Sequence, residues 1–300
     1  MTLERRTTRR ALVWIAVLAV FAILLLLANQ FTEGERFYGL AMTVVIAAAL
    51  LGLLGIYRAT AGRGIWRVRT RHIGIMAAGA AAHAALTYLF NDLISVSMGP
   101  LSLQPQICVP ILLGYAFSPV VGFFTGAVGS LMGDFVTGWG VFPAWHIGSG
   151  LTGLVPGLVA LVSYERQNLR YLSTLVVILM AMTAGIVLVH PRAPEPWTGE
   201  VRNFSFWGWT LIVASLVMVA NSLLLERLSL ALAGVNLWGT LGIIVGNAFT
   251  SLAHTWTNEY GLATAVIGEF APAVGEDVVN LMIFTPLLLA AYNAIRPVRR

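Results

Sequence analysis

A small set of polar and aromatic residues interrupts an otherwise apolar sequence, and their types are those that bind small molecules. They are Asp134, Trp139, Trp145, His146, Trp256, Glu276, Asp277 and Asn280. Carboxylates beside apolar helices are costly, so they usually line a cavity or a pathway. Tryptophan rings offer stacking and cation–π attraction to a flat or cationic ring. The set therefore predicts a substrate-binding pocket.

The acids also predict which ligands the pocket accepts. Asp134, Glu276 and Asp277, if close together, would repel an anion. We therefore expect a neutral or cationic ring compound of vitamin size, more like thiamine than folate. The alternative is a solvated outer face with an aromatic belt, which would account for the tryptophans alone. It does not account for the three acids and Asn280, which abut glycine-rich or apolar helix.

The sequence contains no motif that predicts catalysis. It has no phosphate loop, no HExxH and no dinucleotide-binding fingerprint, so we predict that the protein is not an enzyme. Its histidines are too scattered for a metal site, and its single cysteine, Cys108, lies in an apolar run. We therefore predict no metal and no cofactor. Haem ligation by His83 and His254 stays open as an alternative, although no partner motif accompanies them.

The composition predicts an all-α protein that crosses a membrane many times. The 300 residues are 58% hydrophobic and 10% charged, whereas soluble domains carry about 25% charged residues. A span needs about 20 apolar residues. About ten such spans are predicted, at 11–28, 38–57, 72–91, 106–117, 119–137, 144–164, 170–189, 205–225, 237–256 and 277–295. Three prolines between 100 and 110 indicate that 106–117 is short or broken.

The arginines orient these spans. All 18 basic residues are arginine, and all but Arg36, Arg192 and Arg202 fall on one side when the spans alternate. Basic residues concentrate on the cytoplasmic side of membrane proteins. The pattern predicts a multi-pass protein of the plasma (inner) membrane, surrounded by lipid, with both termini cytoplasmic. Because topology accounts for the positive charge, no nucleic-acid partner is predicted.

Two glycine-rich helices are predicted to form the centre of the molecule. Gly122, Gly126, Gly129 and Gly133 recur about one helical turn apart, and Gly150, Gly153 and Gly157 follow in the next span. Small residues let helix backbones approach closely, which holds helices together in lipid. The two spans are therefore expected to pack tightly as an antiparallel pair.

A second small-residue surface lies on the span 72–91. Gly74, Ala78 and Ala82 line one face, and further alanines line the adjacent face. Such faces usually pack inside their own protein. Two adjacent small faces exceed what one internal neighbour requires, so a partner subunit is expected to dock on Gly74, Ala78 and Ala82.

The segment from about 72 to 164 resembles the substrate-binding S components of energy-coupling factor (ECF) vitamin transporters. The resemblance is carried by AAGAAAHAA, by GYAFSPVVGFFTGAVGSLMGDF and by FPAWHIGSGLTGLVPGL. Residues 275–297 resemble the last helix of that family, and 237–256 resemble its penultimate helix. The resemblance implies a helical core that captures a vitamin-sized molecule on the outer face. It also implies a membrane coupling subunit and two ATPase subunits as partners, docked through the alanine-rich helix.

The chain has about four more predicted helices than the six-helix family pattern. The expected domains follow from where these extra helices lie. Residues 1–71 form an N-terminal two-helix extension, and residues 72–300 form the S-component-like domain with a two-helix insertion at about 170–225. The expected function is the substrate-capturing membrane subunit of an ECF-type importer. The alternative is an accessory or sensory subunit of a larger membrane complex that uses the same scaffold without transport.

Overall fold

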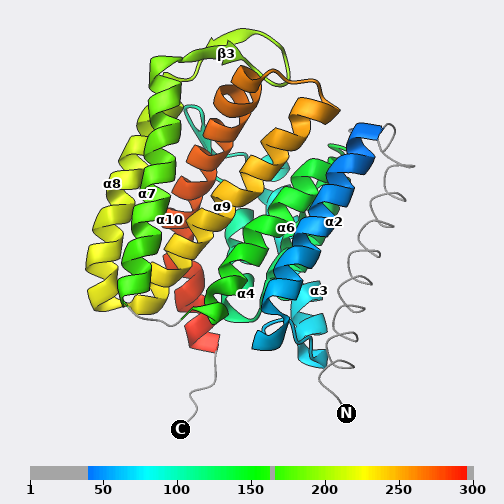
Figure 1. Ribbon diagram of the computed structural model, residues 1–300, viewed down its shortest axis with the longest axis vertical. Coiled ribbons are helices and arrows are strands. Elements are labelled where there is room, and N and C mark those ends of the chain that lie inside the picture. The colour runs from blue at the N-terminus through cyan, green and yellow to red at the C-terminus, as the bar shows by residue number, and fades with distance from the viewer. Residues whose placement is uncertain (1–39, 163–165, 296–300) are drawn as a thin grey trace.

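The computed structural model describes residues 40–162 and 166–295, and these form a bundle of helices (Figure 1). Seven helices within the described residues are long and apolar enough to cross a membrane. The prediction of an all-α polytopic membrane protein is confirmed. The predicted span 11–28 lies outside the described residues, and the total of ten spans stays a prediction.

Each of the other nine predicted spans coincides with a helix in the described residues. These helices are α2 (Leu40–Thr60), α3 (Thr70–Tyr88), α4 (Cys108–Ala116), α5 (Pro119–Thr137), α6 (Pro143–Gly157), α7 (Arg166–Val189), α8 (Ser205–Leu228), α9 (Leu230–Thr257) and α10 (Ala271–Ile295). Short 3-10 turns are η1 (Ala61–Arg63), η3 (Pro105–Ile107) and η4 (Leu158–Leu161), and π-helical turns are η2 (Leu89–Leu93) and η5 (Thr264–Phe270). Two antiparallel hairpins complete the described chain: β1 (Ser97–Met98) with β2 (Leu101–Ser102), and β3 (Arg192–Pro194) with β4 (Val201–Asn203).

The glycines bring α6 into backbone contact with α5 on one side and with α9 on the other. A Cβ atom at Gly122 would lie 2.0 Å from the carbonyl oxygen of Gly153, and one at Gly126 would lie 2.1 Å from that of Ser149. On the other side, a Cβ at Gly242 would lie 2.5 Å from the carbonyl oxygen of Thr152. No side chain fits at these distances, so the centre of the bundle depends on glycine.

The glycine stripe of α5 serves two neighbours rather than the single one that was predicted. Gly122 and Gly126 face α6, whereas a Cβ at Gly129 would lie 2.7 Å from Cβ of His83 on α3. A Cβ at Gly133 would similarly lie 2.9 Å from Cβ of Thr87. The stripe drifts around the helix because a helical turn has 3.6 residues and the glycine spacing is not constant. As a result α5 packs closely between α6 and α3.

Two helix boundaries differ from the prediction and matter for the site. The predicted span 106–117 contains only a nine-residue α-helix, α4, preceded by the irregular segment 94–107. The span predicted to begin at 277 starts earlier, because helical structure runs through η5 into α10. The polar run Gly275-Glu276-Asp277 resembles a helix end in the sequence, but it lies inside the helix.

The helices α7 and α8, predicted as an insertion, pack as an antiparallel pair at one edge of the bundle (Figure 1). Their buried residues, such as Val176, Met180, Leu211 and Met218, join a core cluster that continues into α9 and α10. A separate core cluster joins α2, α3, α5 and α6. The pair α7–α8 therefore enlarges the apolar core on the side of α9 and α10.

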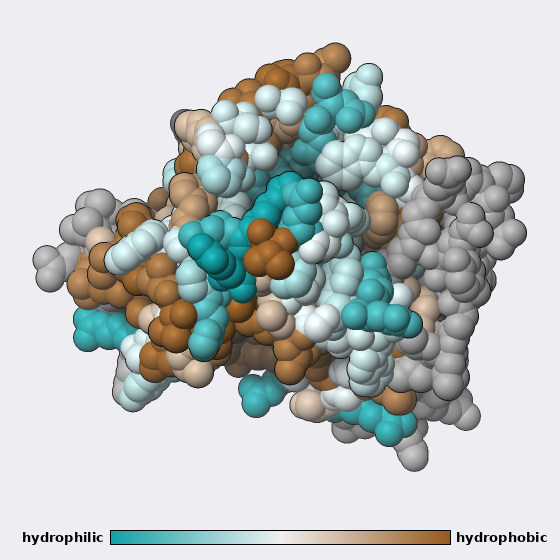
Figure 2. All heavy atoms as spheres, turned by 90° about the horizontal axis from the view of Figure 1, so that it is seen from above, coloured by the Kyte–Doolittle hydropathy of each residue, from teal (hydrophilic) through white to brown (hydrophobic). Residues whose placement is uncertain are grey.

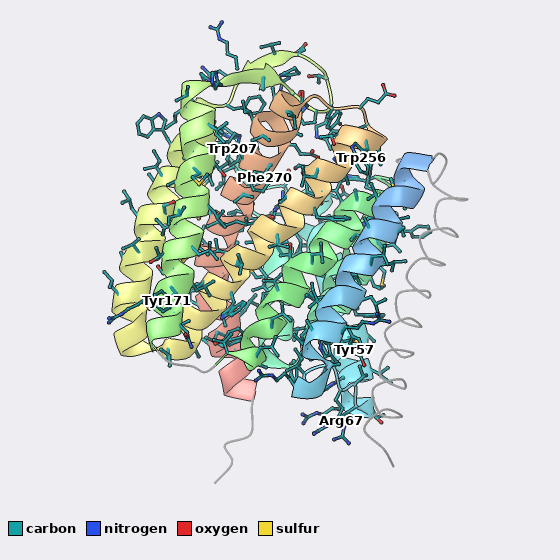
Figure 3. All side chains as sticks on the ribbon, in the orientation of Figure 1. Tyr57, Arg67, Tyr171, Trp207, Trp256 and Phe270 are labelled. Atoms are coloured by element: carbon teal, nitrogen blue, oxygen red, sulfur yellow. The ribbon has the colours of Figure 1, made fainter. Side chains whose placement is uncertain are left out.

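The bundle has two chemically different ends. We call the end that carries residues 192–203, the β3–β4 hairpin, the hairpin end, and the end that carries residues 58–71 the arginine end. Arg67 and Tyr57 lie near the arginine end, and Trp207 and Trp256 lie near the hairpin end (Figure 3). Seen from the hairpin end, hydrophilic residues form a band across the middle of this face (Figure 2). The site lies under this face.

Candidate functional site

A cavity of about 630 Å³ lies beneath the hairpin end, which we call the main cavity. Its size falls within the range of about 300–1,000 Å³ that is usual for small-molecule sites. Its wall is built by α3, η2, the segment 104–107, α5, α6, α9, α10 and the hairpin. The residues that line it are His83, Thr87, Asn91, Gln104, Gln106, Ile107, Ser130, Asp134, Trp139, Phe142, Trp145, Gly148, Ser149, Thr152, Trp197, Asn247, Thr250, Ala273, Glu276 and Asp277.

All three predicted acids line this cavity. Asp134 comes from the last turn of α5, whereas Glu276 and Asp277 come from the second turn of α10. Asp277 Oδ2 accepts a hydrogen bond of 2.9 Å from Asn247 Nδ2, and Glu276 Oε1 accepts one of 2.6 Å from the backbone N–H of Ser102. Among the described residues, no Lys or Arg lines the main cavity. Its three acids therefore have no basic partner on the wall.

The predicted tryptophans divide between the cavity and the surface. Trp139 and Trp145 line the main cavity. Trp256 does not line it and is 61% exposed at the end of α9, where an indole suits a membrane interface. In the structure Trp256 therefore lies on the exposed surface, outside the cavity lining, although its helix contributes other residues to the cavity wall.

His146 is fully buried behind the cavity wall and does not line it. Its Nε2 accepts a hydrogen bond of 3.0 Å from the backbone N–H of Phe142, which leaves Nδ1 to carry the proton of the neutral ring. Nδ1 lies 3.0 Å from Ser130 Oγ and 3.8 Å from Asp134 Oδ2. His146 thus contacts two cavity-lining residues, Ser130 and Asp134, and holds the backbone N–H of Phe142 just before α6, and its predicted contact with ligand stays a prediction.

Asn280 is also fully buried and does not line the cavity. Its Oδ1 accepts a hydrogen bond of 2.7 Å from the backbone N–H of Gln104, and its Nδ2 donates one of 2.9 Å to the carbonyl oxygen of Ser102. Asn280 therefore fixes the irregular segment before α4 onto α10. Its role in the site is to position Gln104 and Gln106, which do line the cavity.

Fifteen of the lining residues were not in the predicted set, and three of these, His83, Gln106 and Trp197, bear most directly on binding. His83 and Gln106 are buried, and their Nδ1 and Oε1 atoms have no hydrogen-bond partner among the described residues. Buried polar atoms are nearly always paired, so these two atoms are candidates for contact with a ligand or water. Trp197 comes from the hairpin and packs edge-to-face on Phe142, with ring centroids 6.1 Å apart. None of the three follows a local motif, because each depends on how distant segments meet.

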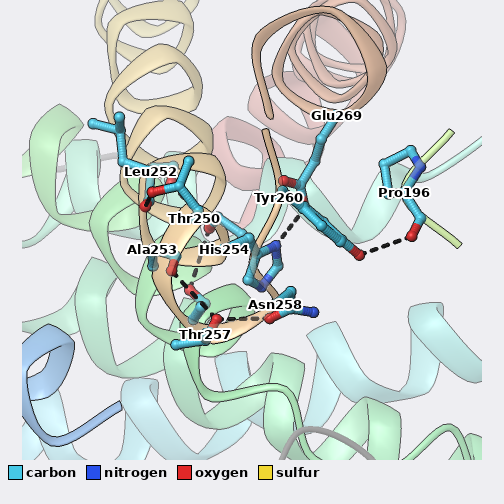
Figure 4. A network of polar contacts seen from close by, with 12 residues as sticks. Pro196, Thr250, Leu252, Ala253, His254, Thr257, Asn258, Tyr260 and Glu269 are labelled. Atoms are coloured by element: carbon cyan, nitrogen blue, oxygen red, sulfur yellow. Dashed lines mark hydrogen bonds and ion pairs between the residues drawn. The ribbon is translucent and has the colours of Figure 1, made fainter. Parts of the chain in front are cut away.

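A buried polar network next to the main cavity joins α9 to η5 and to the hairpin (Figure 4). His254 Nδ1 lies 2.6 Å from Glu269 Oε1, and both side chains are less than 5% exposed. The His254 ring contacts Trp145 and Tyr260 edge-on, with centroids 6.0 and 5.8 Å apart. Tyr260 Oη in turn donates a hydrogen bond of 2.9 Å to the carbonyl oxygen of Pro196 in the hairpin. The network therefore ties a cavity-lining tryptophan to the hairpin.

The predicted docking residues Gly74, Ala78 and Ala82 are exposed on α3 in the part of the chain that the structure describes. A Cβ at Gly74 would meet no described atom within 4 Å. The opposite face of α3 carries His83 and Thr87 toward α5 and the cavity.

Among the described residues, no three His, Cys, Asp or Glu side chains form a group that could hold a metal ion.

Comparison with known proteins identifies one family. The model of the family described as "ECF-type riboflavin transporter, S component" matches residues 67–198, which confirms the resemblance over that segment. A UPF0397 protein of Vibrio atlanticus is 38% identical over 65 residues, which are 22% of this chain and 36% of that protein. A UPF0397 protein of Streptococcus pneumoniae is 42% identical over 57 residues, which are 19% of this chain and 31% of that protein. The chain thus aligns with about a third of the length of these relatives. No solved structure matches it.

Proposed function

We propose that this chain, whose residues 67–198 match the S-component family, is the substrate-capturing membrane subunit of an ECF-type importer. The main cavity is the observation that carries this proposal. Fifteen of its twenty lining residues, from His83 to Trp197, belong to the matched segment, and the other five come from α9 and α10. A preformed cavity in a multi-pass protein that has acids, amides and tryptophans on its wall is suited to binding a small polar ring compound.

The lining chemistry supports a neutral or cationic ligand of vitamin size. Trp139, Trp145 and Trp197 offer flat faces, and the acids offer acceptors for charge-assisted hydrogen bonds. Riboflavin, the compound in the name of the matched family, is a neutral flat ring, and thiamine is a cationic one. Both fit this description, whereas a polyanion would meet three carboxylates and, within the part of the chain that the structure describes, no lining Lys or Arg.

The position of the cavity supports capture from the outside of the cell. It lies under the hairpin end, and the arginine-rich segment 58–71 lies at the other end. Because basic residues favour the cytoplasmic side, the hairpin end is the outer one in this proposal. The chain would then be a multi-pass protein of the plasma membrane with both termini in the cytoplasm.

The exposed face of Gly74, Ala78 and Ala82 supports the partner side of the proposal. S components work with a membrane coupling subunit and ATPase subunits, and a side-chain-free face lets a partner helix approach closely. This face lies on the same helix as His83 and Thr87, which line the cavity. A helix that contacts substrate on one side and a partner on the other would connect capture to transport.

The test of the function is to purify the full-length protein and identify any small molecule that co-elutes by mass spectrometry. We expect the parent protein to retain a neutral or cationic ring compound, because a cavity of this size buries most of such a ligand. Asp277→Asn keeps the shape of the side chain and should weaken affinity about tenfold or more, since a charge-assisted hydrogen bond is lost.

The matched control is Asp92→Asn, which changes the same group at an exposed position outside the cavity. Its affinity should stay within about twofold of the parent, a difference that corresponds to a few tenths of a kcal/mol. If the retained compound is a polyanion, or if both variants bind it equally well, the proposed site is wrong. A protein that retains no compound and copurifies with a kinase or a respiratory complex would favour the accessory or sensory role.

A further inference from the structure

A second cavity of about 420 Å³ lies directly beneath the β3–β4 hairpin. We call it the hairpin chamber. It is enclosed by residues 195–207, by η5 and by the first turn of α10. Trp145, Trp197, Ala273 and Glu276 line both the hairpin chamber and the main cavity, so the two spaces adjoin. A molecule in the main cavity can therefore extend into the chamber.

The hairpin is held in place over the chamber by specific contacts. A Cβ atom at Gly268 would lie 2.6 Å from the carbonyl oxygen of Pro194, so glycine lets the hairpin sit on η5. Tyr260 Oη donates a hydrogen bond to the carbonyl oxygen of Pro196, and Ala193 is buried to 1% exposure. Because these contacts fix the hairpin on η5 and on the loop between α9 and η5, the chamber is preformed.

The wall of the chamber carries a buried acceptor that has no partner. Glu269 is 5% exposed and lines the chamber. Its Oε1 lies 2.6 Å from His254 Nδ1, whereas its Oε2 is buried with no hydrogen-bond partner among the described residues. Leaving a buried carboxylate oxygen unpaired is costly, so a donor from a ligand would be favourable there.

The other lining groups favour a cationic donor. Trp145, Trp197 and Trp207 contribute aromatic rings, which attract cations through their faces. The chamber is also lined by Arg202, but that guanidinium lies 3.5 Å from Glu195 and 3.3 Å from Glu200, so its charge is already paired. The remaining acidic groups of the wall are Glu276 and Glu269, whose Oε2 has no hydrogen-bond partner among the described residues.

We infer that the hairpin chamber binds a positively charged nitrogen group, and that the substrate is a two-part molecule with its uncharged ring in the main cavity. This inference rests on the proposed function and narrows its substrate class. The charged group would lie among the tryptophans and against the free oxygen of Glu269. The shared wall formed by Trp145 and Ala273 allows a linker of only a few atoms to join the two parts.

The test compares thiamine, a two-part cation, with its uncharged pyrimidine alcohol fragment, using tryptophan fluorescence titration of the full-length protein. The parent should bind thiamine about tenfold or more tightly than the fragment, since only thiamine brings the charge. Glu269→Gln should reduce this preference to about threefold or less, because it removes the charge and keeps the shape. Glu259→Gln, a matched change at an exposed position that lines neither cavity, should preserve the preference.

A second variant tests whether one molecule occupies both spaces. Ala273→Leu narrows the junction and should weaken thiamine about tenfold while changing fragment affinity less than about twofold. Unchanged fragment affinity in each variant also shows that the main cavity is still folded. The inference is overturned if the parent binds neither compound, if it shows no preference, or if Glu269→Gln keeps the preference. If the parent binds thiamine and the fragment equally well, and Asp277→Asn weakens that binding, the inference is wrong but the proposed function still stands.

Discussion

The side chain of Asn280 holds the backbone of Gln104, a residue 176 positions earlier, through a hydrogen bond of 2.7 Å from the Gln104 N–H to its Oδ1. The same amide donates to the carbonyl oxygen of Ser102. These bonds satisfy the backbone of an irregular segment that lies between helices, where unpaired polar groups are costly. They also place Gln104 and Gln106 at the cavity wall.

We predict that Asn280→Leu loosens the segment 101–107 and weakens ligand binding. Leucine has a similar volume but leaves the Gln104 N–H and the Ser102 carbonyl without these partners, at a cost of about 1–3 kcal/mol. The measurement is hydrogen–deuterium exchange of the purified protein, which should show faster exchange at 101–107. Asn168→Leu, near the start of α7 and far from this segment, is the control. Unchanged exchange at 101–107 would contradict the assigned role.

We predict that Gly153→Ala destabilises the bundle strongly. Its Cβ would lie 2.2 Å from the carbonyl oxygen of Gly122, a backbone atom that cannot rotate away. Overpacking of this kind costs about 1–3 kcal/mol. Gly185→Ala is the control, because a Cβ there meets nothing within 4 Å. Thermal unfolding in detergent should show a lower Tm for Gly153→Ala and an equal or higher Tm for Gly185→Ala; equal losses would count against backbone contact.

We predict that His83→Leu lowers ligand affinity about tenfold, since a ring nitrogen available to the ligand is lost. The matched control is His72→Leu on the same helix, because His72 is also buried but does not line the cavity. Affinity for the co-purified compound, measured by tryptophan fluorescence, should fall only in the first variant. A similar loss in both would indicate a general packing effect on α3.

We predict that Ala78→Leu and Ala82→Leu impair association with a coupling subunit while leaving ligand affinity within about twofold. Leucine costs little where lipid surrounds the helix, but its bulk prevents close approach of a partner helix. Ala181→Leu, at an exposed position of α7, is the control. The measurement is co-purification with the coupling subunit. Equal recovery for all three variants would rule out docking on this face.

We predict that the hairpin end faces outside. In a Cys108→Ser background, a cysteine at Thr198 should react with a membrane-impermeant thiol reagent in intact cells, and one at Gly62 should not. Both positions are exposed, and Cys108 is buried. Permeabilised cells should label both. Reaction at Gly62 alone in intact cells would invert the orientation.

The sequence predicted those parts of the fold that depend on local pattern. Apolar length located nine helices within the described residues, seven of them long enough to cross a membrane, and glycine spacing predicted the close approach of α5 and α6. It could not show that Gly129 and Gly133 turn toward α3, because the direction of a stripe depends on which helices surround it. It also placed the start of the last helix at 277, since Gly275-Glu276-Asp277 resembles a polar helix end.

The site was predictable where a residue type was unusual for its surroundings. Asp134, Glu276 and Asp277 stand out in apolar helices, and all three line the main cavity. His146 and Asn280 are equally unusual for their surroundings, but their side chains accept hydrogen bonds from the backbone N–H groups of Phe142 and Gln104. His83, Gln106 and Trp197 were missed because a buried unpaired atom or a hairpin lying over a cavity is visible only in three dimensions.

Gly122 and Gly126 of α5, and Gly242 of α9, contact the backbone of α6. These contacts have a consequence for how this protein can acquire new ligands. Those contacts use main-chain atoms, so the frame of the cavity is independent of the side chains that line it. Exchanging Trp139, Asn247 or Trp197 alters the chemistry of the wall without altering the spacing of α5, α6 and α9. Ligand preference and structural integrity are thus encoded at separate positions, which makes this scaffold a suitable starting point for directed evolution toward other ring compounds.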